Sequence, residues 1–186
     1  TDLMNAGTPL VGETAFGSAV DVWVLENDGA GTVVVVGSPM SVAARGEAYV
    51  YYNRGDGEGG VQAQLALQPP HAPGPYDNFG YSVATNGDWV AVSAPLARGT
   101  GVVYVYQRRD GNGDGDAPSW SLHSTLVPPT RSGAARCEAF GYSVALSAAG
   151  TLVVGAPQQN RTYVYEVNRD GDAWHLDAML TSAHAA

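Results

Sequence analysis

One pattern recurs three times along this chain of 186 residues. Its first element, Phe-Gly, begins at positions 16, 79 and 140, at intervals of 63 and 61 residues (79 − 16 and 140 − 79). A second element follows each copy and ends in proline at position 39, 95 or 157. A tyrosine-rich run, a turn rich in Asp, Gly and Asn, and a segment of alternating apolar residues complete each copy. Self-similarity at a nearly fixed period predicts a stack of equivalent structural units.

Each unit is predicted to form four β-strands. In the second unit we expect them near residues 80–85, 89–94, 102–107 and 119–126. The second strand is continuously apolar, as in a strand covered on both faces, and the third is β-branched and aromatic. The fourth alternates, so Trp174, Leu176, Ala178 and Leu180 of the last unit are expected on one face. The predicted fold is therefore all-β, with three four-stranded antiparallel blades at approximately 16–68, 79–127 and 140–181.

The Phe-Gly element suits a crowded joint between two units. Glycine permits close approach of two backbones, and a Phe ring contributes a large buried area. We therefore expect the phenylalanines to wedge between neighbouring blades. The predicted structural positions of the repeat are Phe16, Gly17, Gly37, Pro39, Phe79, Gly80, Pro95, Phe140, Gly141, Gly155 and Pro157.

These paired elements resemble the FG-GAP repeat, as in the propeller of integrin α-subunits. The string from Phe140 to Leu180 is more similar to a second FG-GAP class, found in secreted and surface proteins of bacteria and algae. The resemblance covers essentially the whole chain. It implies β-propeller blades, an extracellular or cell-surface location, and a non-catalytic role in adhesion or in binding a protein partner, sibling blades or a glycan. It implies no enzymatic activity and no required cofactor. The alternative is a structural subunit of a surface filament or appendage.

Three blades are fewer than the roughly four to eight of closed propellers. The first and last residues both fall just after a predicted outermost strand. We therefore expect the chain to be part of a larger propeller, with further blades from the same polypeptide or from another one. The total number of blades stays open. Because repeat stability depends on interfaces between neighbours, the isolated chain is expected to be poorly stable.

Composition narrows the classes of partner. The formal net charge of −9 argues against nucleic acid, whose phosphates would be repelled, and against anionic membrane surfaces. The longest apolar run, residues 32–37, is far too short to span a bilayer, so no membrane insertion is expected. Because the hydrophobic content is 45%, the chain can bury a core.

The best metal candidate is the loop that joins strands three and four of the second unit. Asp110, Asn112 and Asp114 stand at positions 1, 3 and 5 of a calcium-loop pattern, and Asp116 could add a carbonyl ligand. The position-9 acid of the integrin-type loop is missing, because Pro118 stands there. The loop is thus a weak calcium candidate, and the alternative is a solvated polar hairpin. No tighter than about millimolar binding is expected.

Other motifs carry less chemistry. Asn160 opens a glycosylation sequon, Asn-Arg-Thr, in a predicted loop, and a chance match is the alternative. The Arg-Gly-Asp tripeptide at 54–56 lies in a turn whose equivalent at 168–172 has a similar composition, so we interpret it as a turn. The four histidines share no repeat position or ligand spacing. No nucleophile elbow, Walker or metalloprotease motif is complete.

Overall fold

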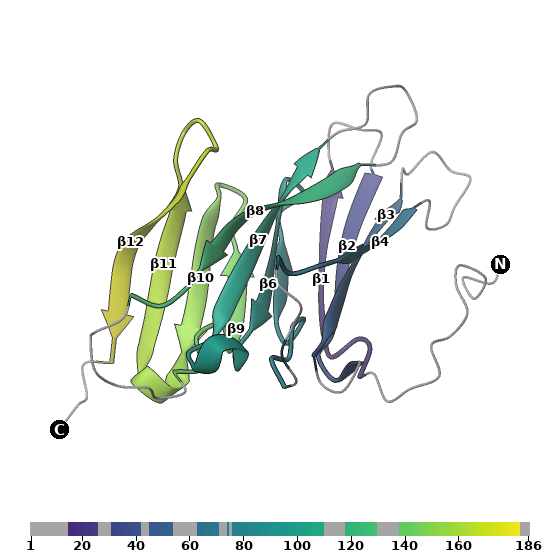
Figure 1. Ribbon diagram of the computed structural model, residues 1–186. Coiled ribbons are helices and arrows are strands. Elements are labelled where there is room, and N and C mark those ends of the chain that lie inside the picture. The colour runs from purple at the N-terminus through teal and green to yellow at the C-terminus, as the bar shows by residue number, and fades with distance from the viewer. Residues whose placement is uncertain are drawn as a thin grey trace.

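The computed structural model describes residues 15–25, 31–41, 45–53, 63–70, 74, 76–109, 118–129 and 138–182. Three four-stranded antiparallel sheets lie side by side in chain order (Figure 1). Each is a meander, in which every strand pairs with the next one along the chain. Blade 1 contains β1 (Ala19–Leu25), β2 (Gly31–Ser38), β3 (Glu47–Asn53) and β4 (Ala63–Leu67); blade 2 contains β5 (Val83–Thr85), β6 (Trp89–Ala94), β7 (Val102–Arg109) and β8 (Ser119–Leu126); blade 3 contains β9 (Ser143–Leu146), β10 (Thr151–Ala156), β11 (Arg161–Val167) and β12 (Trp174–Thr181).

The predicted all-β fold of three propeller-type blades is confirmed. The four strands expected in the second unit are also present, although the first is shorter than predicted. It begins at Val83 because Gly80 has a positive φ of 88° and turns the backbone. The amides of Gly80 and Tyr81 then both donate to the carbonyl of Ser93, 2.9 and 3.3 Å away. Two short 3-10 turns, η2 (Ala97–Gly99) and η3 (Pro157–Gln159), lie between the second and third strands of blades 2 and 3.

Burial distinguishes the central blade from the two end blades. Every residue of β6 is buried, whereas the side chains of β10 alternate between buried and partly buried. In β1 the alternation is between partly buried and exposed positions up to Val24. Blade 2 is covered by a neighbour on each side, so both faces of its second strand are apolar, as the continuous apolar run predicts. Among the described residues, each end blade is covered by a neighbouring blade on one face.

The outermost strands correct one expectation. Val164 pairs with Ala178, but the next residue, Tyr165, pairs with Leu176, so Asp177 is an extra residue in β12. Such a bulge reverses the alternation of side chains beyond it. Ala178 and Leu180 therefore do not share a face with Trp174 and Leu176, and the prediction of one common face was wrong. Because a bulge needs no characteristic residue, the alternating letters alone did not reveal it.

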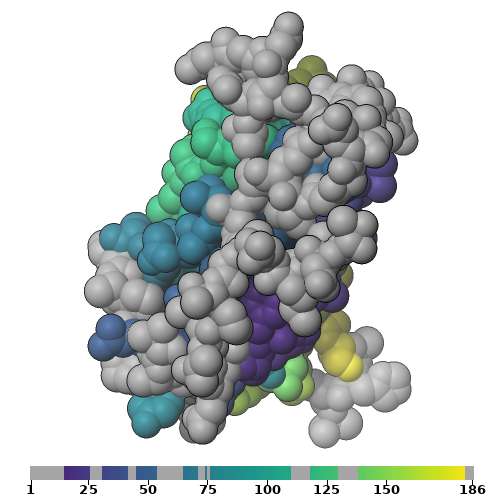
Figure 2. All heavy atoms as spheres, turned by 90° about the vertical axis from the view of Figure 1, so that its right-hand side faces the viewer, coloured from purple at the N-terminus to yellow at the C-terminus, as the bar shows by residue number. Residues whose placement is uncertain are grey.

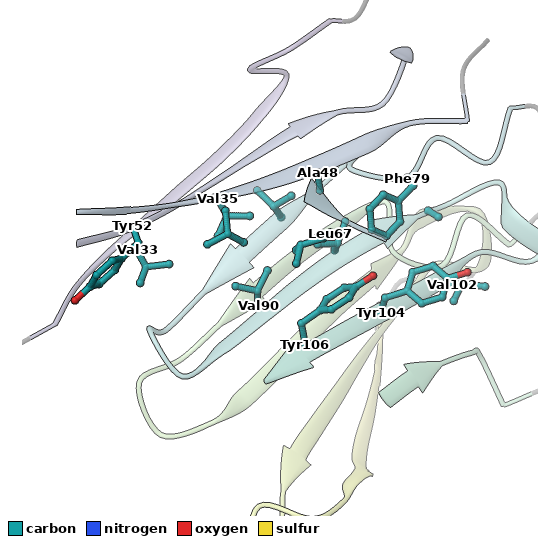
Figure 3. Close-up of a cluster of buried hydrophobic side chains, with 14 of the residues drawn as sticks. Val33, Val35, Ala48, Tyr52, Leu67, Phe79, Val90, Val102, Tyr104 and Tyr106 are labelled. Atoms are coloured by element: carbon teal, nitrogen blue, oxygen red, sulfur yellow. The ribbon is translucent and has the colours of Figure 1, made fainter. Parts of the chain in front are cut away.

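Two hydrophobic clusters form the core, and each lies between two blades. We call the face of a blade that looks toward the preceding blade its front face, and the opposite one its back face. The first cluster joins the back face of blade 1 to the front face of blade 2. Figure 3 shows Val33 and Val35 pointing from blade 1 toward Val90 of blade 2. The second cluster joins the back face of blade 2 to the front face of blade 3 in the same way.

Candidate functional site

The two joints between blades are built around Phe79 and Phe140. Phe79 is 1% exposed and packs against Tyr104 of its own blade, with ring centroids 5.6 Å apart. Its amide donates to the carbonyl of Arg45 in blade 1, at 2.9 Å. Phe140 is 0% exposed, and its ring meets that of Tyr163 edge-on, with centroids 5.3 Å apart. Its amide donates to the carbonyl of Thr100 in blade 2 at 3.1 Å. Both rings thus lie between blades, as the packing argument predicts.

A glycine of the preceding blade receives each phenylalanine. Gly46 directly follows Arg45, Gly101 directly follows Thr100, and their φ values are 87° and 97°. A Cβ at Gly46 would clash with the carbonyl oxygen of Phe79. A Cβ at Gly101 would clash with the carbonyl oxygen of Phe140 and would lie 2.7 Å from the amide nitrogen of that residue. These two glycines were not among the predicted motif residues. Their signal in the sequence was a glycine directly before the third strand in two of the three units.

Three of the predicted motif glycines, Gly37, Gly80 and Gly141, also lie at the joints. A Cβ at Gly37 would clash with the carbonyl oxygen of Gly80, and a Cβ at Gly80 would clash with the carbonyl oxygen of Glu47. At Gly141 it would be 2.9 Å from a methyl carbon of Val103. Gly155 differs, because its nearest neighbour is Ser143 of the same blade. Pro39 and Pro95 are buried, whereas Pro157 in blade 3 is exposed.

Polar side chains in or next to the first strand of each blade form hydrogen bonds between successive blades. The carboxylate of Asp21 accepts from the amide of Thr85 at 2.7 Å, and the hydroxyl of Ser82 accepts from the amide of Val144 at 3.1 Å. The Asn86 side-chain amide donates to the carbonyl of Ser147 at 3.0 Å. The partners are 64, 62 and 61 residues apart, which is close to the repeat period. Sequence reasoning missed these contacts, although the period itself would have brought equivalent positions together.

Phe16 is the exception among the three phenylalanines. Its ring lies 5.8 Å from that of Tyr49, much as Phe79 lies against Tyr104, but it is 54% exposed. Val20, Val22 and Val24 of β1 are exposed on the same side of the blade, at 65%, 56% and 55%. We call Phe16 and these three valines the open face. Figure 2 views the molecule from this side, and the purple atoms of the β1 region are visible there.

Burial raises the pKa of three tyrosines at the joints, Tyr104, Tyr106 and Tyr165. Burial, and secondarily the neighbouring Tyr163, raises the pKa of Tyr165 to about 12. At the open face, burial and then a hydrogen bond to Glu47 raise the pKa of Tyr49 to about 12. The folded chain therefore holds these phenolic protons more tightly than an unfolded chain does.

Stability is consequently expected to fall in alkaline solution. Below about pH 10 tyrosine is protonated in both states, so the contribution is fully present. Between about pH 10 and 12 the unfolded chain releases protons that the folded chain retains, and the midpoint of thermal unfolding should decrease. Tyr165→Phe should make this decrease shallower, whereas Tyr76→Phe, at an exposed side chain, should not. A pH series of melting curves checks this, and equal slopes for the two variants would contradict it.

Two predicted site groups have different outcomes. The calcium candidates Asp110, Asn112, Asp114 and Asp116, like the Arg-Gly-Asp tripeptide, lie outside the described residues. Among the residues that are described, no group of three His, Cys, Asp or Glu side chains could hold a metal ion. Asn160 is described: it is exposed, follows η3, and has a left-handed backbone with φ 52° and ψ 42°.

In the same described ranges, no helix has the length and apolar character needed to cross a bilayer.

A family model described as FG-GAP repeat matches residues 73–106. The matched segment contains Phe79-Gly80, Pro95 and most of β7. These residues belong to the blade 2 side of the joint between blades 1 and 2. Residues 73–106 are an FG-GAP repeat. FG-GAP repeats commonly serve protein interaction or adhesion, and proteins built from them are typically non-enzymatic.

Comparison with solved structures supports the fold. The crystal structure of Sqt1 from Chaetomium thermophilum superimposes with a TM-score of 0.50 at 9% identity. The match covers 90% of this chain and 36% of that chain, so this chain spans just over a third of the length of Sqt1. At this identity the likeness concerns the fold alone. No curated protein gives a significant sequence match to the chain.

Proposed function

We propose that this FG-GAP chain is a non-catalytic interaction module of a secreted or cell-surface protein. The observation that carries the proposal is the open face, where Phe16 and three valines are more than half exposed. Soluble proteins rarely leave a contiguous apolar patch of this kind uncovered unless it binds something. The net charge of −9 makes a protein surface or a glycan a better partner than a polyanion.

A structural subunit of a surface filament or appendage is the second candidate. The chemistry of the open face favours it, because valines and a Phe ring predominate there. Permanent interfaces are more hydrophobic than transient ones. In that role the chain would pack once against sibling subunits and would not exchange partners.

Two further features are proposed with this function. A secreted or surface location would make Asn160-Arg161-Thr162 available for N-glycosylation, and the exposed left-handed turn at Asn160 offers an accessible acceptor. Weak calcium binding by the 110–116 loop is compatible with the same location, where free calcium is in the millimolar class. No resident cofactor is proposed.

The interaction role is tested by binding of the fluorescently labelled chain to intact cells of its source. The double variant Phe16→Asp/Val22→Asp is expected to bind about tenfold more weakly or worse, because it places two charges at the centre of the apolar face. The matched control is Leu96→Asp/Val127→Asp, which changes two exposed apolar side chains elsewhere. Equal binding by the two double variants, or no binding by the unmodified chain, would contradict the proposal.

A further inference from the structure

The two joints in the chain show what covers the equivalent of the open face in blades 2 and 3. Phe79 and Phe140 occupy the same repeat position as Phe16, and in each case the back face of the preceding blade covers them. The valine equivalent to Val20 is Val83 in blade 2, where it is 7% exposed, against 65% for Val20.

Gly17 gives an independent indication of a missing neighbour. Gly80 and Gly141 have φ values of 88° and 85° and lie against the preceding blade, where a Cβ would meet Glu47 or Val103. Gly17 has the same backbone, with φ 87°, but a Cβ there would meet nothing within 4 Å. Blade 1 thus has the conformation of a joint without the blade that would complete it.

The back face of blade 3 is built differently, beginning with its connection between the second and third strands. In blades 1 and 2 this connection has eight and seven residues, 39–46 and 95–101, between the paired positions Ser38↔Glu47 and Ala94↔Val102. In blade 3 it has four, 157–160, between Ala156 and Arg161. The two longer connections supply the carbonyl that accepts from the next phenylalanine. The residue in the corresponding position of blade 3, Gln159, belongs to the tight η3 turn.

Asn160 occupies the position of the two receiving glycines. It directly precedes the third strand, as Gly46 and Gly101 do, and it has the same left-handed sense of backbone, with φ 52°. At those glycines a Cβ would lie on the carbonyl oxygen of the incoming phenylalanine. The side chain of Asn160 therefore fills the space that a fourth blade would need.

Polar residues also replace part of the apolar back face, although Val153 and Val164 remain paired at its centre. Thr151 and Glu166 pair at the end of blade 3, and Glu166 is exposed. The equivalent cross-strand pair in blade 1 is Val33 with Tyr52, both buried in the core. Thr162 stands at the position of Ala48 and of Val103, which are fully buried. Burying an unpaired carboxylate under a further blade would be costly.

We propose that the array accepts a further blade at one end alone: the occupant of the open face is an FG-GAP-type blade with a glycine-ended connection before its third strand. Because blade 3 lacks that connection, a second copy of these 186 residues does not provide the occupant, and blade 3 terminates the array. The proposal rests on the proposed function in treating the open face as a binding surface. Its tests use purified chains, so a failure of cell binding would leave it standing.

The first test supplies the blade covalently. One variant carries a second copy of residues 79–139 between Ala15 and Phe16. Its matched control carries the same residues, ordered 127–139 then 79–126, after Ser182. The front insertion is expected to raise the unfolding midpoint by about 5 °C or more, because it buries the front face of blade 1, whereas the control should leave the midpoint unchanged. Equal stabilisation by the two additions would overturn the proposal.

The second test needs no added blade. The connection Pro157–Asn160 is replaced by the sequence of residues 95–101, together with Thr162→Val and Glu166→Gln, which install the corresponding residues of blade 2. This chain is expected to associate head to tail, with at least a doubling of its mass by light scattering, and Phe16→Ala should abolish that association. If the unmodified chain already associates and Val153→Asp on blade 3 abolishes it, the back face of blade 3 accepts a blade and the proposal fails.

Discussion

Phe140→Ala is expected to reduce the free energy of unfolding by about 3–5 kcal/mol. The ring is fully buried between blades 2 and 3, and it contacts both Tyr163 and Tyr165. Removing the ring leaves a cavity at the joint. The two sheets cannot move together to fill it, because hydrogen bonds between their strands hold each sheet in shape. Denaturant unfolding followed by tryptophan fluorescence measures the change, since Trp89 and Trp174 lie at the same joint.

Phe16→Ala is the matched control for this prediction. The same residue type in the same repeat position is 54% exposed, so its removal should cost about 0.5 kcal/mol or less. Similar losses for the two variants would show that burial between blades is not what makes the motif phenylalanine important.

Gly101→Ala is expected to have the second largest effect, a loss of about 2–5 kcal/mol. The left-handed backbone at φ 97° costs an alanine about 1–2 kcal/mol. Overpacking against the backbone of Phe140 adds roughly 1–3 kcal/mol, because a peptide group cannot move aside as a flexible side chain can. Hydrogen exchange of the Phe140 amide, which donates to Thr100, would report opening of this joint.

Gly99→Ala separates the two contributions. Gly99 has a positive φ of 74°, but a Cβ there would meet nothing within 4 Å. This variant should therefore lose about 1–2 kcal/mol from its backbone alone. If Gly101→Ala is no more destabilising than Gly99→Ala, the close approach of the two blades is not the reason for the glycine.

The candidate surface was only partly predictable from the sequence. That Phe79 and Phe140 wedge between blades followed from the repeat, because each copy must bury the same ring against the next copy. The receiving glycines Gly46 and Gly101 were not identified, since they stand outside the Phe-Gly and Gly-Ala-Pro elements. The hydrogen bond from Thr85 to Asp21 was also missed, because neither residue belongs to a motif and their contact exists only once two blades are stacked.

By itself, the sequence determined the repeat, the number of blades in the chain and the order of strands within each blade. Periodic patterns and turn residues act within one unit, so they can be read without knowing what the unit packs against. The tertiary structure decided which copies of a residue are covered. Phe16 and Phe140 are the same letter in the same motif, yet one is exposed and the other buried. The burial of a residue depends on the neighbouring blade. The importance of Asn160 likewise became visible only when the strand register placed it at the position of the receiving glycines.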